Sequence, residues 1–323
     1  MRKLIRAWRA SALFVGSVVG AGFATGQELQ LFFRGDGVWS LALAALFMGI
    51  AAFAFMDIGA RRILHDPRLS LCADSVITIT SFAVYAAMIA ASEEVLLQLT
   101  GMAGLSILLA TAVMFLSARH ISWISGLNVI AVPLMALIVI LVGSRSPALT
   151  GGGFHPIRAL AYGGMNLLFS GALMMEEGAA LSRSERVIAS MTAGILIFLM
   201  MWFMWRSING LPTADMPFLI AASREGLGTL ASISLLLAVV TTMASCAYLV
   251  TDRVTALTGD PLLSAPLVTL LGILTATLGF APIVRATYPI VSYLGLAATL
   301  FALAILLHSR LPFRKRKRRV SAP

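Results

Sequence analysis

The residues best suited to bind a small solute or an ion lie in residues 16–28, which read GSVVGAGFATGQE. Each of the four glycines costs about 1 kcal/mol relative to alanine in a helix, so this apolar stretch is a poor unbroken helix. Gln27 and Glu28 follow the glycines directly, and a carboxylate in an apolar segment usually faces a cavity, a partner or an ion path. A helix break here would free amide N–H groups for an anion and carbonyl groups for a cation.

The same glycines also fit a simpler interpretation. Gly16 and Gly20, like Gly22 and Gly26, have the GxxxG spacing that lets two helices approach closely. Close packing does not account for the polar pair that follows the glycines. We therefore favour a break near Ala21.

The composition indicates what surrounds these residues. The 323-residue chain is 59% hydrophobic and 12% charged, with a mean hydropathy of +0.93, whereas soluble domains are about 45–50% apolar and about 25% charged. We therefore predict a single all-α integral membrane domain over residues 1–323 with about ten spanning helices and no soluble domain. The predicted spans are 8–33, 39–59, 73–99, 103–118, 123–143, 157–181, 187–208, 227–251, 262–281 and 287–308.

The distribution of basic residues predicts the orientation of these spans. With a cytoplasmic N-terminus, 18 of the 24 Lys and Arg residues fall on the inner side, as the positive-inside rule requires. Both termini are then cytoplasmic, in a multi-pass protein of the cell (inner) membrane. The basic tail, residues 310–323, would contact anionic lipid headgroups rather than nucleic acid. The six basic residues left outside are Arg34, Arg145, Arg158, Arg206, Arg224 and Arg285.

Several classes of protein are disfavoured. Lysine occurs only at Lys3, Lys315 and Lys317, so there is no GxxxxGK[ST] phosphate-binding loop. Cys72 and Cys246 are far apart, and no HExxH motif occurs. The N-terminus resembles a signal peptide, but no exported soluble domain follows it. We predict that the chain is not an enzyme and needs no cofactor, which leaves a transporter, a channel, or a receptor or scaffold.

The second half of the chain resembles the first in layout. The sixth predicted span, 157–181, contains paired glycines and then Ser170 and Gly171, where we predict a second break. Repeat one, about residues 6–143, and repeat two, about residues 157–309, each have five spans and therefore opposite orientations. Such an inverted repeat is typical of secondary transporters.

The glycine motif also resembles that of a known family. Spans beginning G-x-x-[IV]-G-[AS]-G occur in the amino acid–polyamine–organocation (APC) superfamily, whose LeuT-type fold is a 5+5 inverted repeat with discontinuous helices 1 and 6. The longer string VGAGFATGQE resembles the YkvI-like bacterial membrane proteins within that superfamily, with weaker support from Tyr162 and Asn166.

The resemblance implies a substrate site at the two breaks. The amides of Gly20, Ala21 and Gly22 would hold an amino-acid carboxylate, the carbonyls from Gly20 to Phe23 would complete an ion site, and the ring of Tyr85 would cover the substrate. The full implied substrate set is Gly20, Ala21, Gly22, Phe23, Tyr85, Asn166, Ser170 and Gly171.

The eighth span resembles the sodium-binding helix of that fold. Thr241, Thr242 and Ser245 offer hydroxyl oxygens suited to a hard cation such as Na⁺, although such hydroxyls also bond back to their own helix. No other metal is expected.

Proton coupling is the alternative to sodium coupling. Glu28 and Glu94 are the candidates, because a buried carboxylate can bind and release a proton. Gln27, next to Glu28, is a further predicted ion-coupling residue. Glu94 fits an outer, water-filled vestibule equally well.

Together these features predict a secondary active transporter (a symporter). It would move a small amino acid or related amine by alternating access, coupled to a Na⁺ or H⁺ gradient. The alternative is a membrane receptor, sensor or scaffold that keeps the fold without transporting. A channel is less favoured, because no span carries a polar stripe that would line a pore. The substrate, the coupling ion and the oligomeric state stay open at this point.

Overall fold

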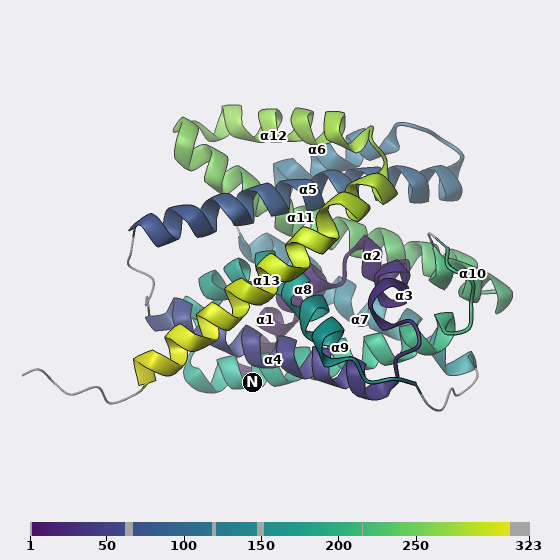
Figure 1. The fold of residues 1–323 in the computed structure, drawn as a ribbon. Helices are drawn as coiled ribbons and strands as arrows, with labels where there is room; N and C mark the ends of the chain where they lie inside the picture. Colours follow the sequence, from purple (N-terminus) through teal and green to yellow (C-terminus); the bar gives the residue numbers. More distant parts are fainter. Residues whose placement is uncertain (1, 62–66, 118–120, 147–151, 215, 311–323) are drawn as a thin grey trace, which may run out of the picture.

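The computed structural model describes residues 2–61, 67–117, 121–146, 152–214 and 216–310, without the side chains of 67–73, 261 and 309–310. The basic tail predicted beyond residue 310 lies outside the described residues. The described part of the chain folds into thirteen helices (Figure 1). They are α1 (Arg2–Val18), α2 (Ala21–Ala24), α3 (Gln27–Phe33), α4 (Val38–Arg61), α5 (Pro67–Thr100), α6 (Leu105–Ser117), α7 (Ile121–Arg145), α8 (Pro156–Ala179), α9 (Arg183–Ile208), α10 (Pro217–Arg224), α11 (Gly228–Thr258), α12 (Pro261–Ala276) and α13 (Phe280–Arg310).

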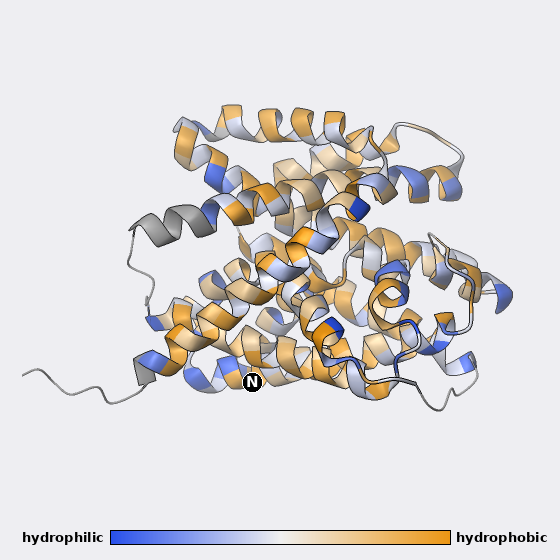
Figure 2. Ribbon diagram, in the orientation of Figure 1, coloured by the Kyte–Doolittle hydropathy of each residue, from blue (hydrophilic) through white to orange (hydrophobic). Residues whose placement is uncertain are grey.

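Every predicted span coincides with one of these helices or, for the first span, with the series α1, α2 and α3. The short helix α10 was not predicted. Within the described residues, α4, α5, α7, α9, α11 and α13 are long and apolar enough to cross a membrane, while α6 and α12 are apolar but shorter. Hydrophilic residues gather toward the ends of the long helices, and their middles are apolar (Figure 2). The chain is therefore an all-helical, multi-pass membrane protein.

The helices form two groups, upper and lower in Figure 1. In the bundle, α4 packs on α8 and α9, and α1 packs on α8 and α9. In the outer group, α5 and α11 pack on each other, and α6 and α12 contact both. Helices α7 and α13 each contact members of both groups. A solute site between the groups would therefore be lined by α1, α8, α5 and α11.

The predicted break in the first span is present. Helix α1 ends at Val18, and Gly20 adopts an extended conformation (φ −86°, ψ −171°) before the single turn of α2. A second interruption follows at Gly26, whose φ of 81° lies in the left-handed region that favours glycine. The glycine-rich stretch therefore divides the span into three pieces.

The predicted break at Ser170 and Gly171 is wrong, because α8 is continuous through both residues. The Ser170 hydroxyl donates to the carbonyl of Asn166 (2.5 Å), one turn earlier on the same helix. A Cβ on Gly171 would lie 2.9 Å from the ring of Phe55 in α4. This glycine serves close packing between α8 and α4, so it frees no backbone group.

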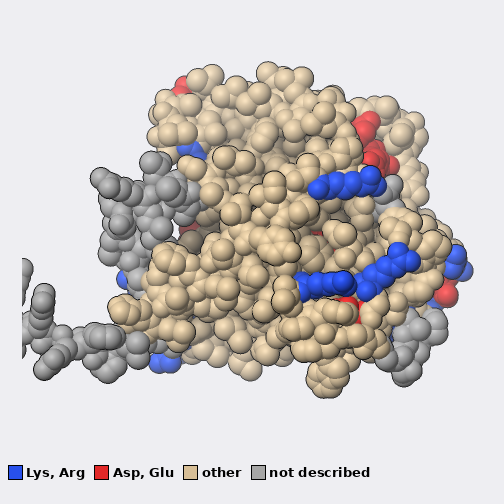
Figure 3. Space-filling model, in the orientation of Figure 1, with Lys and Arg blue, Asp and Glu red and all other residues tan. Residues whose placement is uncertain are grey.

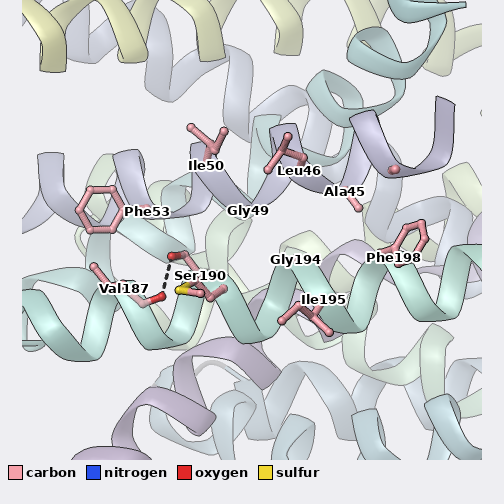
Figure 4. Close-up of a pocket in the computed structure, with 12 residues that line it drawn as sticks. Ala45, Leu46, Gly49, Ile50, Phe53, Val187, Ser190, Gly194, Ile195 and Phe198 are labelled. Atoms are coloured by element: carbon pink, nitrogen blue, oxygen red, sulfur yellow. Dashed lines mark hydrogen bonds between the residues drawn. The ribbon is translucent and has the colours of Figure 1, made fainter. Parts of the chain in front are cut away.

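Glycines also bring α4 and α9 together. A Cβ on Gly49 would lie 3.3 Å from the carbonyl oxygen of Ser190, and 3.5 Å from the Cα of Gly194. Figure 4 shows the groove of about 550 Å³ beside this crossing, flanked by Leu46, Ile195 and other apolar side chains. Leu46 is 61% exposed, as expected of a surface that faces lipid.

Charged side chains link residues for which the sequence predicts the same side of the membrane. At the predicted inner end, the buried carboxylate of Asp57 binds Arg186 (3.0 Å) and Arg61 (2.9 Å). At the predicted outer end, Arg34 donates to the hydroxyl of Thr213. The wide middle of the face in Figure 3 is uncharged.

Candidate functional site

A small central cavity lies beside the first break, between the bundle and the outer group. Its volume is about 30 Å³, enough for one or two water molecules. Glu28 is the only ionisable side chain other than tyrosine among the described residues that line it. The lining residues are Ser17, Val18, Gly20, Glu28, Val84, Met165, Asn166, Phe169, Thr242, Thr287, Tyr288 and Val291.

The carboxylate of Glu28 is the central polar feature of this cavity. It is only 5% exposed, and its Oε1 accepts a hydrogen bond from the hydroxyl of Tyr288 (2.7 Å). Its Oε2 is buried and has no hydrogen-bond partner among the described residues. A buried charge without a partner is costly, so this oxygen is suited to a proton or to a cation brought by a ligand.

Gly22 makes room for this pair. A Cβ on Gly22 would lie 2.2 Å from Glu28 Oε1 and 2.6 Å from the Tyr288 hydroxyl. The position therefore accommodates only glycine while the hydrogen bond is in place.

A larger cavity, the vestibule, lies on the other side of Glu28 and Tyr288. Its volume is about 580 Å³, and these two residues line both cavities. The Glu28–Tyr288 hydrogen bond thus stands between the central cavity and the vestibule. The described residues that line the vestibule are Gln27, Glu28, Gln30, Leu31, Arg34, Thr213, Ala214, Val284, Arg285, Tyr288 and Pro289.

Only one of the predicted substrate residues of the first span lines the central cavity. Gly20 lines the central cavity, and Gly22 contacts the Glu28–Tyr288 pair. Ala21 and Phe23 are fully buried and do not line it. In this conformation the break reaches the cavity through Gly20 alone.

Tyr85 lies elsewhere, which corrects its predicted place over the substrate. A Cβ on Gly272 would lie 2.5 Å from the Tyr85 ring, so the ring packs against α12. Val84, the neighbouring residue, lines the cavity instead. Adjacent residues on a helix point about 100° apart, so the choice between them could not be made without the orientation of α5.

The predicted residues of the sixth span are also divided. Asn166 lines the cavity, and its amide donates to the carbonyl of Tyr162 (3.0 Å). Ser170 and Gly171 do not line it. The α8 residues that line the cavity, Met165, Asn166 and Phe169, directly precede the predicted break.

Of the three predicted sodium ligands, Thr242 alone reaches the first span. Its hydroxyl donates to the carbonyl of Gly16 (3.2 Å) and lies 3.5 Å from that of Val19. The hydroxyls of Thr241 and Ser245 instead donate to carbonyls of their own helix (both 3.0 Å). A hard-cation site at this point would centre on Thr242 and the two α1 carbonyls.

The structure separates the two predicted proton-coupling carboxylates. Glu28 lies between the two cavities, and Gln27 lines the vestibule beside it. Glu94 is exposed near the end of α5 and lines neither cavity. Its exposure fits contact with water at the protein surface better than a buried coupling role.

Sequence reasoning missed the contribution of the last span. Tyr288 and Thr287 line the central cavity from α13. The local signal is a tyrosine directly before Pro289, inside a largely apolar segment. Nothing in the sequence pairs this tyrosine with Glu28, which is 260 positions away.

No group of three or more His, Cys, Asp or Glu side chains that could hold a metal ion occurs in the described part of the chain. No protein-family profile matches the sequence. No curated protein matches it either.

Solved structures do match over most of the chain. Mhp1, a nucleobase-cation-symport-1 family transporter in a closed conformation with bromovinylhydantoin bound, has a TM-score of 0.64 at 15% identity, covering 93% of this chain and 77% of that chain. A mutant of the manganese transporter of Eremococcus coleocola has a TM-score of 0.63 at 15% identity, covering 94% and 78%. Inward-facing Mhp1 has a TM-score of 0.53 at 14% identity, covering 93% and 75%. The chain therefore has the fold of these membrane transporters.

Proposed function

We propose that this protein is a secondary active transporter of a small amino acid or related amine, coupled to a Na⁺ or H⁺ gradient. The observation that carries the proposal is the position of Glu28. This buried carboxylate lies next to a helix break, and it lines both the central cavity and the vestibule. A broken helix and an ionisable side chain between two helix groups are the features around which alternating access operates.

The pattern of helix contacts supports ten spans in a 5+5 inverted repeat. If α1, α4, α5, α6 and α7 are exchanged in order with α8, α9, α11, α12 and α13, the most extensively contacting pairs become contacting pairs. The pair α1–α9 becomes α8–α4, the pair α1–α7 becomes α8–α13, and the pair α7–α11 becomes α13–α5. Such an exchange is expected of two repeats with one fold. It agrees with the APC-like interpretation. The distribution of basic residues, rather than the helix contacts, is the reason to propose cytoplasmic termini and a location in the cell membrane.

The closed central cavity fits one step of such a cycle. About 30 Å³ is too small for an amino acid, so loading requires the bundle to move relative to the outer group. The chain is more similar to Mhp1 in a closed conformation (TM-score 0.64) than to inward-facing Mhp1 (0.53). The cavity and the comparison agree on a closed state.

Two sites suit the coupling ion. Glu28 Oε2, which has no hydrogen-bond partner among the described residues, could bind a proton. The oxygens of Thr242, Gly16 and Val19 converge from α11 and α1 and are of the type that Na⁺ prefers. A Na⁺ ion bound there would contact the two carbonyl oxygens and the Thr242 hydroxyl oxygen, in place of the hydrogen bond that this hydroxyl now donates.

Uptake into proteoliposomes tests the proposal. Radiolabelled amino acids and their decarboxylated amines are offered under an imposed Na⁺ gradient, an imposed pH gradient, or neither. We expect gradient-driven accumulation of one solute class that Glu28→Gln abolishes. Gly126→Ala is the matched control, because nothing lies within 4 Å of the added Cβ. Saturable binding without accumulation under any gradient would instead identify a receptor.

A further inference from the structure

The vestibule carries an arrangement of charge that transport by itself does not require. Two of the six arginines predicted on the outer side, Arg34 and Arg285, line this single cavity. Glu28 is the only acidic side chain among its described lining residues. Positive charge at the rim and one carboxylate at the floor form an electrostatic dipole across the cavity.

The two arginines are brought there by regular helix faces. Gln27, Gln30, Leu31 and Arg34 recur every three or four residues along α3 and its C-cap, so they share one face. Arg285 lies three residues before Tyr288 on α13, about 4.5 Å along the helix axis. The guanidinium of Arg285 therefore extends from the α13 turn next to the one that carries Tyr288, the hydrogen-bond donor to Glu28.

The guanidinium groups are available to a ligand. Arg285 is exposed and makes no hydrogen bond or ion pair with the described residues. Arg34 donates to the hydroxyl of Thr213, which uses one of its five N–H groups. In Figure 3 basic side chains lie on both sides of a recess at the end of the molecule where α13 begins.

The floor of the vestibule carries the opposite charge, on a buried side chain. Glu28 Oε1 accepts from Tyr288, whereas Oε2 has no partner among the described residues. A solute nitrogen that bears a positive charge would satisfy this oxygen. A carboxylate on the same solute would lie toward the arginines, which bind carboxylates well through their planar fork.

We propose that the vestibule is an outer binding site for amphoteric solutes, in which Arg285 and Arg34 hold the carboxylate and Glu28 holds the cationic nitrogen. This inference rests on the proposed transport function and narrows its substrate class from amino acids or related amines to amino acids alone. An amine without a carboxylate leaves the arginines unused, and a carboxylate without an amine leaves Glu28 unpaired. Both should bind more weakly than the amphoteric compound.

Binding to the purified full-length protein in detergent tests the inference separately from transport. The probes are leucine, isopentylamine and 4-methylpentanoate, which share one side chain and differ in the charged groups. We expect leucine to bind at least about tenfold more tightly than either analogue, since a charge-assisted hydrogen bond contributes about that factor or more. Equal affinity for leucine and isopentylamine would overturn the inference.

Variants test the part of the site formed by the arginines. Arg285→Gln should weaken leucine binding by about 10- to 100-fold and leave isopentylamine binding unchanged. Arg224→Gln is the matched control, an exposed arginine predicted on the same side that lines a different cavity. It should change neither affinity. Thermal unfolding of each variant establishes that it is folded.

The outcomes separate this site from the transport proposal. If Arg285→Gln and Arg34→Gln both bind leucine as the native protein does, the amphoteric site is wrong, even where uptake is intact. If leucine binding follows the expected pattern but no gradient drives uptake, the site stands and the transport function falls. Failure of the native protein to bind any amino acid of the standard twenty would overturn the site.

Discussion

Replacement of Gly22 by alanine is the most direct perturbation of the site. The added Cβ would lie 2.2 Å from Glu28 Oε1 and 2.6 Å from the Tyr288 hydroxyl, well inside contact distance. Both side chains are buried, so neither can move into solvent without opening the wall between the two cavities. We therefore expect Gly22→Ala to separate Glu28 from Tyr288.

The expected cost follows from two destabilising contributions and one that opposes them. Overpacking costs about 1–3 kcal/mol, and loss of a hydrogen bond to a charged group adds about 1.5–3 kcal/mol. Alanine returns about 1 kcal/mol through its higher helix propensity. The net destabilisation of Gly22→Ala is then roughly 1.5–5 kcal/mol. Gly20→Ala should cost less than about 1 kcal/mol, because its Cβ would meet Thr242 Oγ1 only at 3.3 Å.

Thermal unfolding in detergent measures the loss of stability, and uptake into proteoliposomes measures the loss of transport. We expect the unfolding temperatures to rank Gly126→Ala at or above the native protein, then Gly20→Ala, then Gly22→Ala. Uptake should follow the same order, with Gly22→Ala inactive. The reasoning is refuted if Gly22→Ala unfolds and transports as the native protein does, or if Gly20→Ala is the more damaged variant.

Three further changes probe buried polar contacts, each read from thermal unfolding. Gly16→Ala places a Cβ 1.6 Å from Asn128 Oδ1 and should cost about 1–3 kcal/mol. Adding Asn128→Ala to this variant should restore stability. Purely additive effects of the two substitutions would contradict the contact. Tyr288→Phe leaves Glu28 without its donor and should cost about 1.5–3 kcal/mol, so an unchanged unfolding temperature would count against that hydrogen bond. Asp57→Ala leaves a buried arginine unpaired and should cost about 3–5 kcal/mol, whereas Asp74→Ala, in a partly exposed pair, should cost less than about 1 kcal/mol; similar costs for the two would refute the difference in burial.

Local sequence chemistry predicted the helices and the first break well. Apolar runs of spanning length located the segments that the structure folds as helices. The glycines before Gln27 located the break because glycine loses stability inside a helix whatever the surrounding fold. Both signals depend on residues close together in the chain.

The second break failed because the same residue types have two uses. Gly171 looks like a helix interruption in the sequence, but in the fold it admits the ring of Phe55 from α4. Ser170 looks like a free hydroxyl, but it bonds back to its own helix. Which use applies depends on a neighbour more than a hundred positions away. The same limit hid Tyr288, whose partner Glu28 lies at the opposite end of the chain.

A tyrosine–glutamate hydrogen bond joins separate helices at two places in the structure. The Tyr288 hydroxyl meets Glu28 on the vestibule side, and the Tyr248 hydroxyl donates to Glu176 (2.6 Å), joining α11 of the outer group to α8 of the bundle. Glu28 is buried and Glu176 is exposed, so water competes for the second bond but not for the first. In the proposed cycle, a ligand that takes over Glu28 from Tyr288 would therefore affect the conformational balance more than one that displaces Tyr248 from Glu176. Because a ligand shifts a conformational equilibrium only through its different affinities for the two states, the buried carboxylate is where solute binding can be converted into movement.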